Sequence, residues 1–329
     1  MTTNAGALPD IDVLVDHSLR LGSDVRLTQG AGGNLSAKAD GVMWIKASGT
    51  RLAEAADRQI FVAMHEAQTR AAVLVTEDLA PCVVPGQDPR LRPSIETALH
   101  VLLPHRFVFH VHAIGTIAAG LGDDVGEVVA TLPTSFDTVV VPYAKPGIEL
   151  ARAVLEAGLP SHVPGRALVL VLRNHGLVVG ADDAETVTQV MSTVEDSLRL
   201  VPAPLRDALS RADVPDGYDP VLAAGTVDER SRAVLCAGPL TPDSAVFLGP
   251  EPFGAGAQDA ARRHSALIRG DGSVVVHADL GTDEREIVVS LVDAARQSRT
   301  RSRVSALSGA QVDELVNWEA EKWRRNQKR

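Results

Sequence analysis

Cysteine is scarce in this sequence. Cys82 and Cys236 are the only two in 329 residues, and neither belongs to a C-x-x-C pattern. Two isolated cysteines support neither a disulfide framework nor a thiolate zinc site. Any zinc ion bound by this chain must therefore be held by histidine and carboxylate side chains.

Excess positive charge and long apolar runs are also missing. The formal net charge is −10, which disfavours a general binder of nucleic acid or of a membrane surface, since both polyanions would repel the chain. No run approaches the ~18 apolar residues that span a bilayer, and the start of the chain has no cationic segment followed by an apolar core. We therefore expect a cytoplasmic protein whose 45% hydrophobic content supports a sizeable core.

Two histidines share one face of an expected strand. His110 and His112 lie in a run of β-formers, and because side chains alternate along a strand, both imidazoles point the same way. Two imidazoles so placed can converge on one cation. About 0.3 His-x-His pairs are expected by chance at this composition, so ordinary hydrogen-bonding roles stay open for the pair taken alone.

A third imidazole and a carboxylate complete a candidate site. The buried-strand pattern of residues 166–181 breaks at Asn174 and Gly176, which exposes His175 beside a tight turn. Glu96 follows Ser94, a candidate N-cap, at the start of a helix. A turn histidine and a first-turn glutamate favoured by the helix dipole are the alternative interpretations.

Two glycine-containing turns are candidate anion sites. Gly30, Gly32 and Gly33 precede Asn34, and Ser48-Gly49-Thr50 follows the next expected strand. Glycine lets the backbone approach an anion, and amide and hydroxyl donors bind phosphate oxygens. A dinucleotide fingerprint is excluded because position 35 is leucine and a helix precedes the turn. A plain turn between a helix and a hairpin remains the alternative.

The rest of the chain predicts alternating helices and strands. We expect helices at 10–22, 114–121, 123–131, 148–158, from Asp182 or Asp183 to about 200, and at 284–298, with His17 on the surface of the first. Strands are expected at 58–66, 70–76, 138–142 and 273–278, with short strands within 233–253. Ser308 and Gln311 form a capping-box pattern ahead of a final helix.

The segment 201–205, VPAPL, reads as a linker. It predicts two domains, a metal-binding catalytic domain at 1–204 and a C-terminal α+β extension at 205–329 that ends in a helix.

In order, the motifs GGN, SG, PS-x-E, HxH and NHG resemble the class II aldolase/adducin family over roughly residues 8–200. The resemblance implies an α/β fold, an α/β/α sandwich with a mostly antiparallel central sheet, and a homotetramer with a divalent metal, usually zinc. It implies His110, His112 and His175 as metal ligands. It also implies Glu96 as the catalytic carboxylate, which contacts the metal when no substrate is bound. The implied phosphate pocket consists of Gly33, Asn34, Ser48, Gly49 and Ser94.

The segment LVNWEAEKWR at 315–324 and the mixed segment before it make the chain most similar to the aldolase half of bifunctional rhamnulose-phosphate-type aldolase/short-chain dehydrogenases. On that resemblance, no hydride transfer is expected from these residues. Two positions depart from the family pattern. Ile95 stands where a second serine is common, which questions a phosphorylated substrate. Neither Tyr143 nor Tyr218 matches the tyrosine that donates a proton in some relatives.

The expected function is a zinc-dependent aldolase, a lyase of carbohydrate metabolism that acts reversibly on a ketose or ketose phosphate. The metal would stabilise an enediolate while Glu96 moves the proton. An epimerase, a dehydratase or a decarboxylase of a sugar phosphate would use the same ligands. A noncatalytic, adducin-like interaction module is the alternative from another class.

Overall fold

The computed structural model describes residues 11–158, 163, 165–200, 214–220, 226–255, 259, 264–298 and 303–326. These residues form two compact units. The first comprises the chain up to Val111, Pro133–Val171 and Leu177–Thr193, and the second comprises His112–Leu132, Leu172–Gly176 and the chain from Val194 onward. The expected linker at 201–205 lies outside the described residues, and the domain boundary at 204 stays a prediction.

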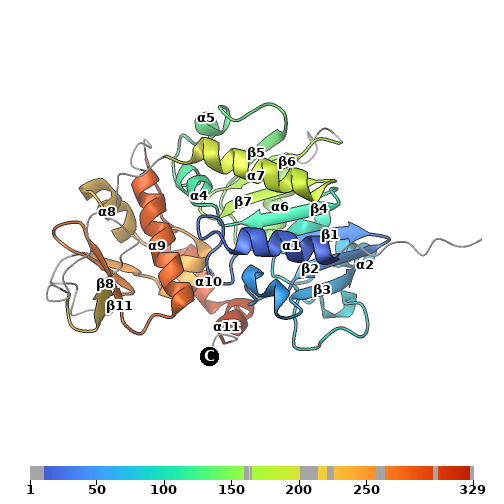
Figure 1. Cartoon of the computed structure of the whole chain (residues 1–329), viewed down its shortest axis with the longest axis horizontal. Coiled ribbons are helices and arrows are strands. Elements are labelled where there is room, and N and C mark those ends of the chain that lie inside the picture. Colours follow the sequence, from blue (N-terminus) through green and yellow to red (C-terminus); the bar gives the residue numbers. More distant parts are fainter. Residues whose placement is uncertain are drawn as a thin grey trace, which may run out of the picture. The chain divides into compact units, whose positions relative to one another are not determined.

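The first unit is built on a seven-stranded sheet (Figure 1). The pairs β1–β2, β2–β3, β1–β4 and β4–β7 are antiparallel, which confirms the expected α/β fold class with a largely antiparallel sheet. In spatial order the strands are β3 (Phe61–His65), β2 (Val42–Lys46), β1 (Asn34–Ala39), β4 (Phe107–Val111), β7 (Gly176–Ala181), β6 (Leu168–Leu172) and β5 (Asp137–Val141).

Helices cover both faces of this sheet. On one face, α2 (Glu66–Ala72), α3 (Thr97–Leu102) and α6 (Ile148–Ala157) contribute to a core cluster with side chains of β2 and β3. On the other face, α1 (Ile11–Gly22) and α7 (Ala184–Leu198) meet through His17 and Thr188, and the His17 ring lies 5.4 Å from that of Phe109 on β4. Residues 109 and 110 of β4 therefore face different helical layers, as strand alternation requires.

The second unit contains a four-stranded sheet in the order β8 (Tyr218–Pro220), β11 (Val274–His277), β10 (Ala266–Ile268), β9 (Phe253–Ala255). Strand β10 is antiparallel to β11 and parallel to β9. The helices of this unit are α4 (Ile114–Gly120), α5 (Val125–Val129), α8 (Glu229–Cys236), α9 (Thr282–Gln297), α10 (Gly309–Asn317) and α11 (Glu319–Asn326).

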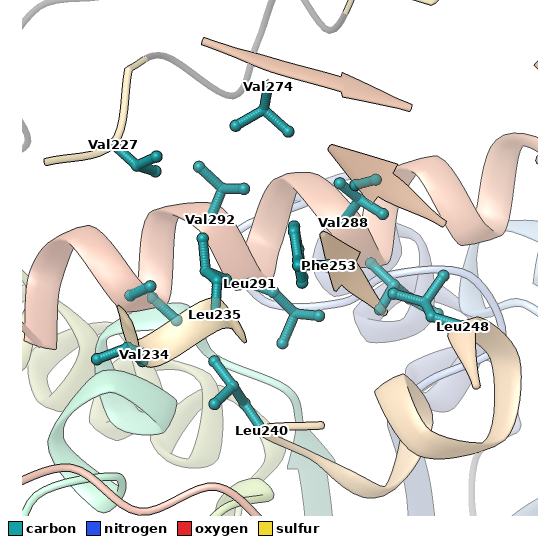
Figure 2. Close-up of a cluster of buried hydrophobic side chains, with 14 of the residues drawn as sticks. Val227, Val234, Leu235, Leu240, Leu248, Phe253, Val274, Val288, Leu291 and Val292 are labelled. Carbon is teal, nitrogen blue, oxygen red and sulfur yellow. The ribbon is translucent and has the colours of Figure 1, made fainter. Parts of the chain in front are cut away.

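Helix α9 organises the core of the second unit. Its Val288, Leu291 and Val292 pack with Leu235 of α8 and Phe253 of β9 (Figure 2). The apolar side of α4 joins the same cluster. An amphipathic helix buries one stripe in this way, so the second unit has a hydrophobic core of its own.

Most expected elements are confirmed. The strands before and after the Asn174 turn are present as β6 and β7, and α6 ends at Ala157 with Gly158 as its C-cap. Asp183 accepts a hydrogen bond from the Thr186 amide at the start of α7, at 2.8 Å. The capping box of Ser308 and Gln311 is formed.

Two strand predictions are wrong. Residues 70–76 continue α2 and then turn, because Arg70 pairs with Glu66 one helical turn earlier and the Val73 amide bonds to the Thr69 carbonyl. Within 233–253, residues up to Cys236 belong to α8, Ser244–Leu248 forms a single wide helical turn, η5, and the strand is limited to the start of β9. The strand prediction failed at 233–236 because the N-cap of α8, Asp228, which accepts a hydrogen bond from the Ser231 amide, was not recognised.

Two side-chain predictions are also wrong. His17 is buried, since its ring is enclosed between Thr188 and Phe109. Helix α3 begins at Thr97 with Glu96 at the N-cap position. Ser94 instead closes a turn, in which its hydroxyl accepts from the Glu96 amide at 3.2 Å.

None of the helices that the structure describes combines the length and apolar content needed to cross a lipid bilayer.

Candidate active site

The ladder between β4 and β7 brings three histidines together. His110 pairs with Val178 and Val111 with Leu177. His112 follows the end of β4, and His175 precedes the start of β7. Because the two strands are antiparallel neighbours, the end of one lies beside the start of the other.

The three imidazoles form a compact, buried group. One ring nitrogen from each of His110, His112 and His175 lies within 4.8 Å of the others. The rings of His112 and His175 are 5.3 Å apart and tilted by 54°. The sequence therefore correctly placed these three side chains together.

The tautomer of His110 follows from its partner. Its Nδ1 lies 3.0 Å from the Leu177 carbonyl oxygen, and a carbonyl can only accept, so Nδ1 carries the proton. In the neutral form of the ring, this tautomer leaves the lone pair on Nε2, which would be the ligand atom. Nε2 lies 3.5 Å from Oε2 of Glu96.

The carboxylate of Glu96 is buried and has a second polar neighbour besides His110. It sits at the N-cap position of α3 and is 4% exposed. The side-chain amide of Asn34, the first residue of β1, donates to Oε2 of Glu96 at 2.7 Å. Asn34 pairs with His110 across the β1–β4 ladder, so sheet register fixes both neighbours of the carboxylate.

The donor set fits a divalent cation. Three imidazoles with one neighbouring carboxylate match the ligand types of catalytic zinc sites, in which Zn–N distances are about 2.0–2.1 Å. A carboxylate oxygen that faces the lone pair of His110 Nε2 is an electrostatic arrangement that a shared cation would stabilise.

The three predicted phosphate-binding segments lie next to one another. The Ser48 amide donates to the Arg92 carbonyl at 2.8 Å, and the Ser94 amide donates to the Lys46 carbonyl at 3.1 Å. The Lys46 ammonium donates to Ala31 in the glycine-rich turn and to Thr50 in the Ser-Gly-Thr turn, at 3.3 and 2.5 Å. The role of these three segments in binding phosphate stays a prediction. Gly49 belongs to the second segment and has a φ of 76°, in the left-handed region that favours glycine.

Lys46 was missed by the sequence interpretation. It is almost fully buried although lysine seldom is, and its ammonium joins the glycine-rich turn to the turn after β2. A lysine at an alternating strand position carries no signal of burial, because its partners are backbone carbonyls distant in sequence.

Gly33 has a structural reason to be glycine. Its φ is +70°, and a Cβ there would lie 2.9 Å from the carbonyl oxygen of His110. The close approach of the turn to β4 therefore requires glycine independently of any ligand.

His100 lies behind the site on α3. It is fully buried, and its Nδ1 is 2.7 Å from the Ser36 hydroxyl. Burial lowers the pKa of His100 to about 3, so this ring is neutral at physiological pH.

Comparison with known proteins identifies the family. Residues 13–201 match the Class II Aldolase and Adducin N-terminal domain, so this chain belongs to the class II aldolase/adducin family. The family indicates an enzyme with aldolase-like chemistry, typically dependent on a divalent metal, and it includes epimerases and decarboxylases.

Among individual relatives, the chain is 32% identical over 203 residues to the protein called "Uncharacterized oxidoreductase YuxG" of Bacillus subtilis (strain 168). That match covers 56% of this chain and 28% of the relative, so the chain spans less than a third of the relative's length.

Solved structures also match part of the chain. The N-terminal class II aldolase domain of a conserved protein from Thermoplasma acidophilum is 26% identical, with a TM-score of 0.49, and covers 60% of this chain and 98% of that one. An L-fuculose 1-phosphate aldolase is 21% identical, with a TM-score of 0.42, and covers 60% of this chain and 86% of that one.

Proposed function

We propose that this protein is a class II, divalent-metal-dependent aldehyde-lyase that cleaves and forms a carbon–carbon bond in a ketose or ketose phosphate. The observation that carries the proposal is the group of three buried histidines with the Glu96 carboxylate 3.5 Å from His110 Nε2. Zinc is the cation that this donor set favours. A homotetramer in the cytoplasm belongs to the same proposal.

The residues divide into three roles. His110, His112 and His175 would hold the cation, which supplies stabilisation of negative charge on substrate oxygen atoms. Glu96 accepts the proton of the C4 hydroxyl as the C3–C4 bond breaks, and returns a proton to C3. Asn34 fixes the position of Oε2 of Glu96 through its 2.7 Å hydrogen bond.

The segments around Gly33, Asn34, Ser48, Gly49 and Ser94 would receive a substrate phosphate. Backbone amides in glycine turns are suitable donors. Ile95 offers no side-chain donor, so a free ketose remains a candidate substrate, and aldehyde release from phosphorylated and free ketoses decides between the two.

The test combines metal content with turnover. Purified protein is loaded with zinc, its stoichiometry is measured by mass spectrometry, and a panel of ketose phosphates and free ketoses is screened for aldehyde release. We expect one metal per chain and cleavage of at least one ketose. Product analysis separates cleavage from epimerisation, dehydration and decarboxylation.

The variant Glu96→Gln tests the proton-transfer role. We expect it to retain zinc and lose about 10²–10⁴-fold in kcat, the range for a general acid–base group. The matched control is Glu149→Gln, which removes an exposed carboxylate paired with Lys145 and should leave kcat unchanged. Near-normal turnover by Glu96→Gln with metal retained would remove Glu96 from the mechanism, and wild-type protein without bound metal would remove the proposal itself.

A further inference from the structure

A second buried carboxylate lies against the histidine group. Oδ2 of Asp243 is 3.3 Å from Nδ1 of His112. Both residues are buried, with 5% of Asp243 and 8% of His112 exposed. Asp243 lies outside the residues 13–201 that match the family, so neither the family motifs nor the sequence interpretation pointed to it.

A tight local network fixes the Asp243 backbone. The Thr241 amide donates to the Ser244 hydroxyl at 2.9 Å, and the Ser244 hydroxyl donates to the Thr241 carbonyl at 2.6 Å. The Ser244 amide in turn lies 3.3 Å from the Thr241 hydroxyl. These bonds close the turn Thr241-Pro242-Asp243-Ser244 on itself, so the carboxylate is presented from a rigid segment.

The same stretch of chain holds the turn that carries His175. The side-chain amide of Asn174 donates to the carbonyls of Leu240 and Ser305, at 3.1 and 2.8 Å. Asn174 has a φ of 55°, a left-handed conformation that asparagine tolerates better than most residues. Residues 240–244 therefore contact both His112 and the residue before His175.

We propose that Asp243 is a positioning residue that sets the tautomer and orientation of His112 in the metal centre. A carboxylate beside Nδ1 keeps the proton on that atom and leaves the Nε2 lone pair for a cation. The Leu177 carbonyl does the same for Nδ1 of His110 at 3.0 Å. The segment 240–244 is then part of the metal centre, and the C-terminal extension is required for metal binding.

This inference rests on the metal site of the proposed function. It differs from a role as a direct ligand, because Asp243 approaches the Nδ1 edge of the His112 ring, whereas Glu96 approaches the Nε2 edge of His110. The two possible roles of Asp243, metal ligand and positioning residue, lead to different expected results for Asp243→Asn. Asparagine can still accept a hydrogen bond from Nδ1–H through its side-chain oxygen, but it is a poor metal ligand.

The experiment measures zinc affinity of the full chain by competition with a chromophoric chelator. Removal of a partner of this kind typically weakens metal affinity about 10–100-fold, and we expect that loss for Asp243→Ala. Asp243→Asn should lose less than Asp243→Ala. The absorption spectrum of the cobalt-substituted Asp243→Asn protein should keep the wild-type coordination bands.

The control is Asp228→Ala, which removes the N-cap of α8 in the same unit. It should lower Tm without changing zinc affinity, and so separates general destabilisation from loss of the metal centre. If Asp243→Ala binds zinc as tightly as wild type, Asp243 has no positioning role and the proposed function stands. If Asp243→Asn loses a ligand band in the cobalt spectrum, Asp243 is a ligand and the positioning role is overturned. If wild-type protein binds no zinc at all, the proposed function and this inference fall together.

Discussion

Glu195 provides the sharpest stability prediction. Its buried carboxylate accepts hydrogen bonds from the Gly115 amide at 2.9 Å and the Thr116 amide at 3.3 Å. These amides open α4, whose N-cap residue Ala113 has no side-chain cap. Glu195 on α7 therefore caps α4 from a distant part of the chain. The capped end of α4 lies two residues after His112 in sequence.

The magnitude follows from the two amides. A hydrogen bond to a charged group contributes about 1.5–3 kcal/mol, and an unsatisfied buried amide costs about 1–3 kcal/mol. Glu195→Ala should lower the free energy of unfolding by about 2–4 kcal/mol. Glu195→Gln keeps one acceptor and should lose about half as much.

The assay is urea unfolding followed by circular dichroism, with the transition midpoint compared at constant slope. The control is Asp196→Ala, an exposed position next to Glu195 on the same helix, for which no measurable change is expected. Gly115→Ala is an independent perturbation, because its Cβ would lie 2.9 Å from Oε2 of Glu195 and displace the carboxylate. A Glu195→Ala protein as stable as Asp196→Ala would refute the capping role.

Three further perturbations have expected outcomes. Burial lowers the pKa of Lys38 to about 7, so between pH 7 and 10 the unfolded chain holds a proton that the folded chain does not. The free energy of unfolding of wild type, relative to that of Lys38→Met, should therefore rise by about 1.4 kcal/mol per pH unit across pH 7.5–9.5 in urea titrations. The same pH dependence of unfolding free energy in both proteins would contradict this expectation. Gly33→Ala forces a left-handed alanine against the His110 carbonyl and should cost at least about 1–2 kcal/mol; a Tm unchanged by the substitution would show that the turn relaxes. Saturation with zinc at 100 times its Kd should stabilise the protein by about 2.7 kcal/mol relative to the chelator-treated form, whereas His175→Ala should show no zinc-dependent shift in Tm.

Much of the geometry of the candidate site was predictable because it depends on short-range rules. Alternation along the expected strand put His110 and His112 on one face, although β4 ends at Val111, and the break at Asn174 and Gly176 marked the turn that carries His175. Each inference needed a few neighbouring residues. The ladder that joins the two strands then brought the three imidazoles together.

The remaining contacts were not predictable from local pattern. Asp243 reaches His112, and Glu195 reaches Gly115, through pairings that no periodicity specifies. His17 was wrongly placed on the surface because an amphipathic stripe does not reveal that Thr188 satisfies its Nδ1. Polar residues enter a core when a distant partner compensates for lost hydration, and a single sequence does not name that partner.

The central position of β4 has a consequence for how this protein tolerates change. The strand is bonded to β1 on one side and β7 on the other, so its alignment is locked from two directions. A one-residue insertion or deletion within Phe107–Val111 would exchange the two faces of the strand. The His110 imidazole would then face the layer occupied by α1, and a phenylalanine of β4 would face Glu96. A substitution changes one side chain of the three-histidine group, whereas a change of chain length in β4 would separate the group in one step.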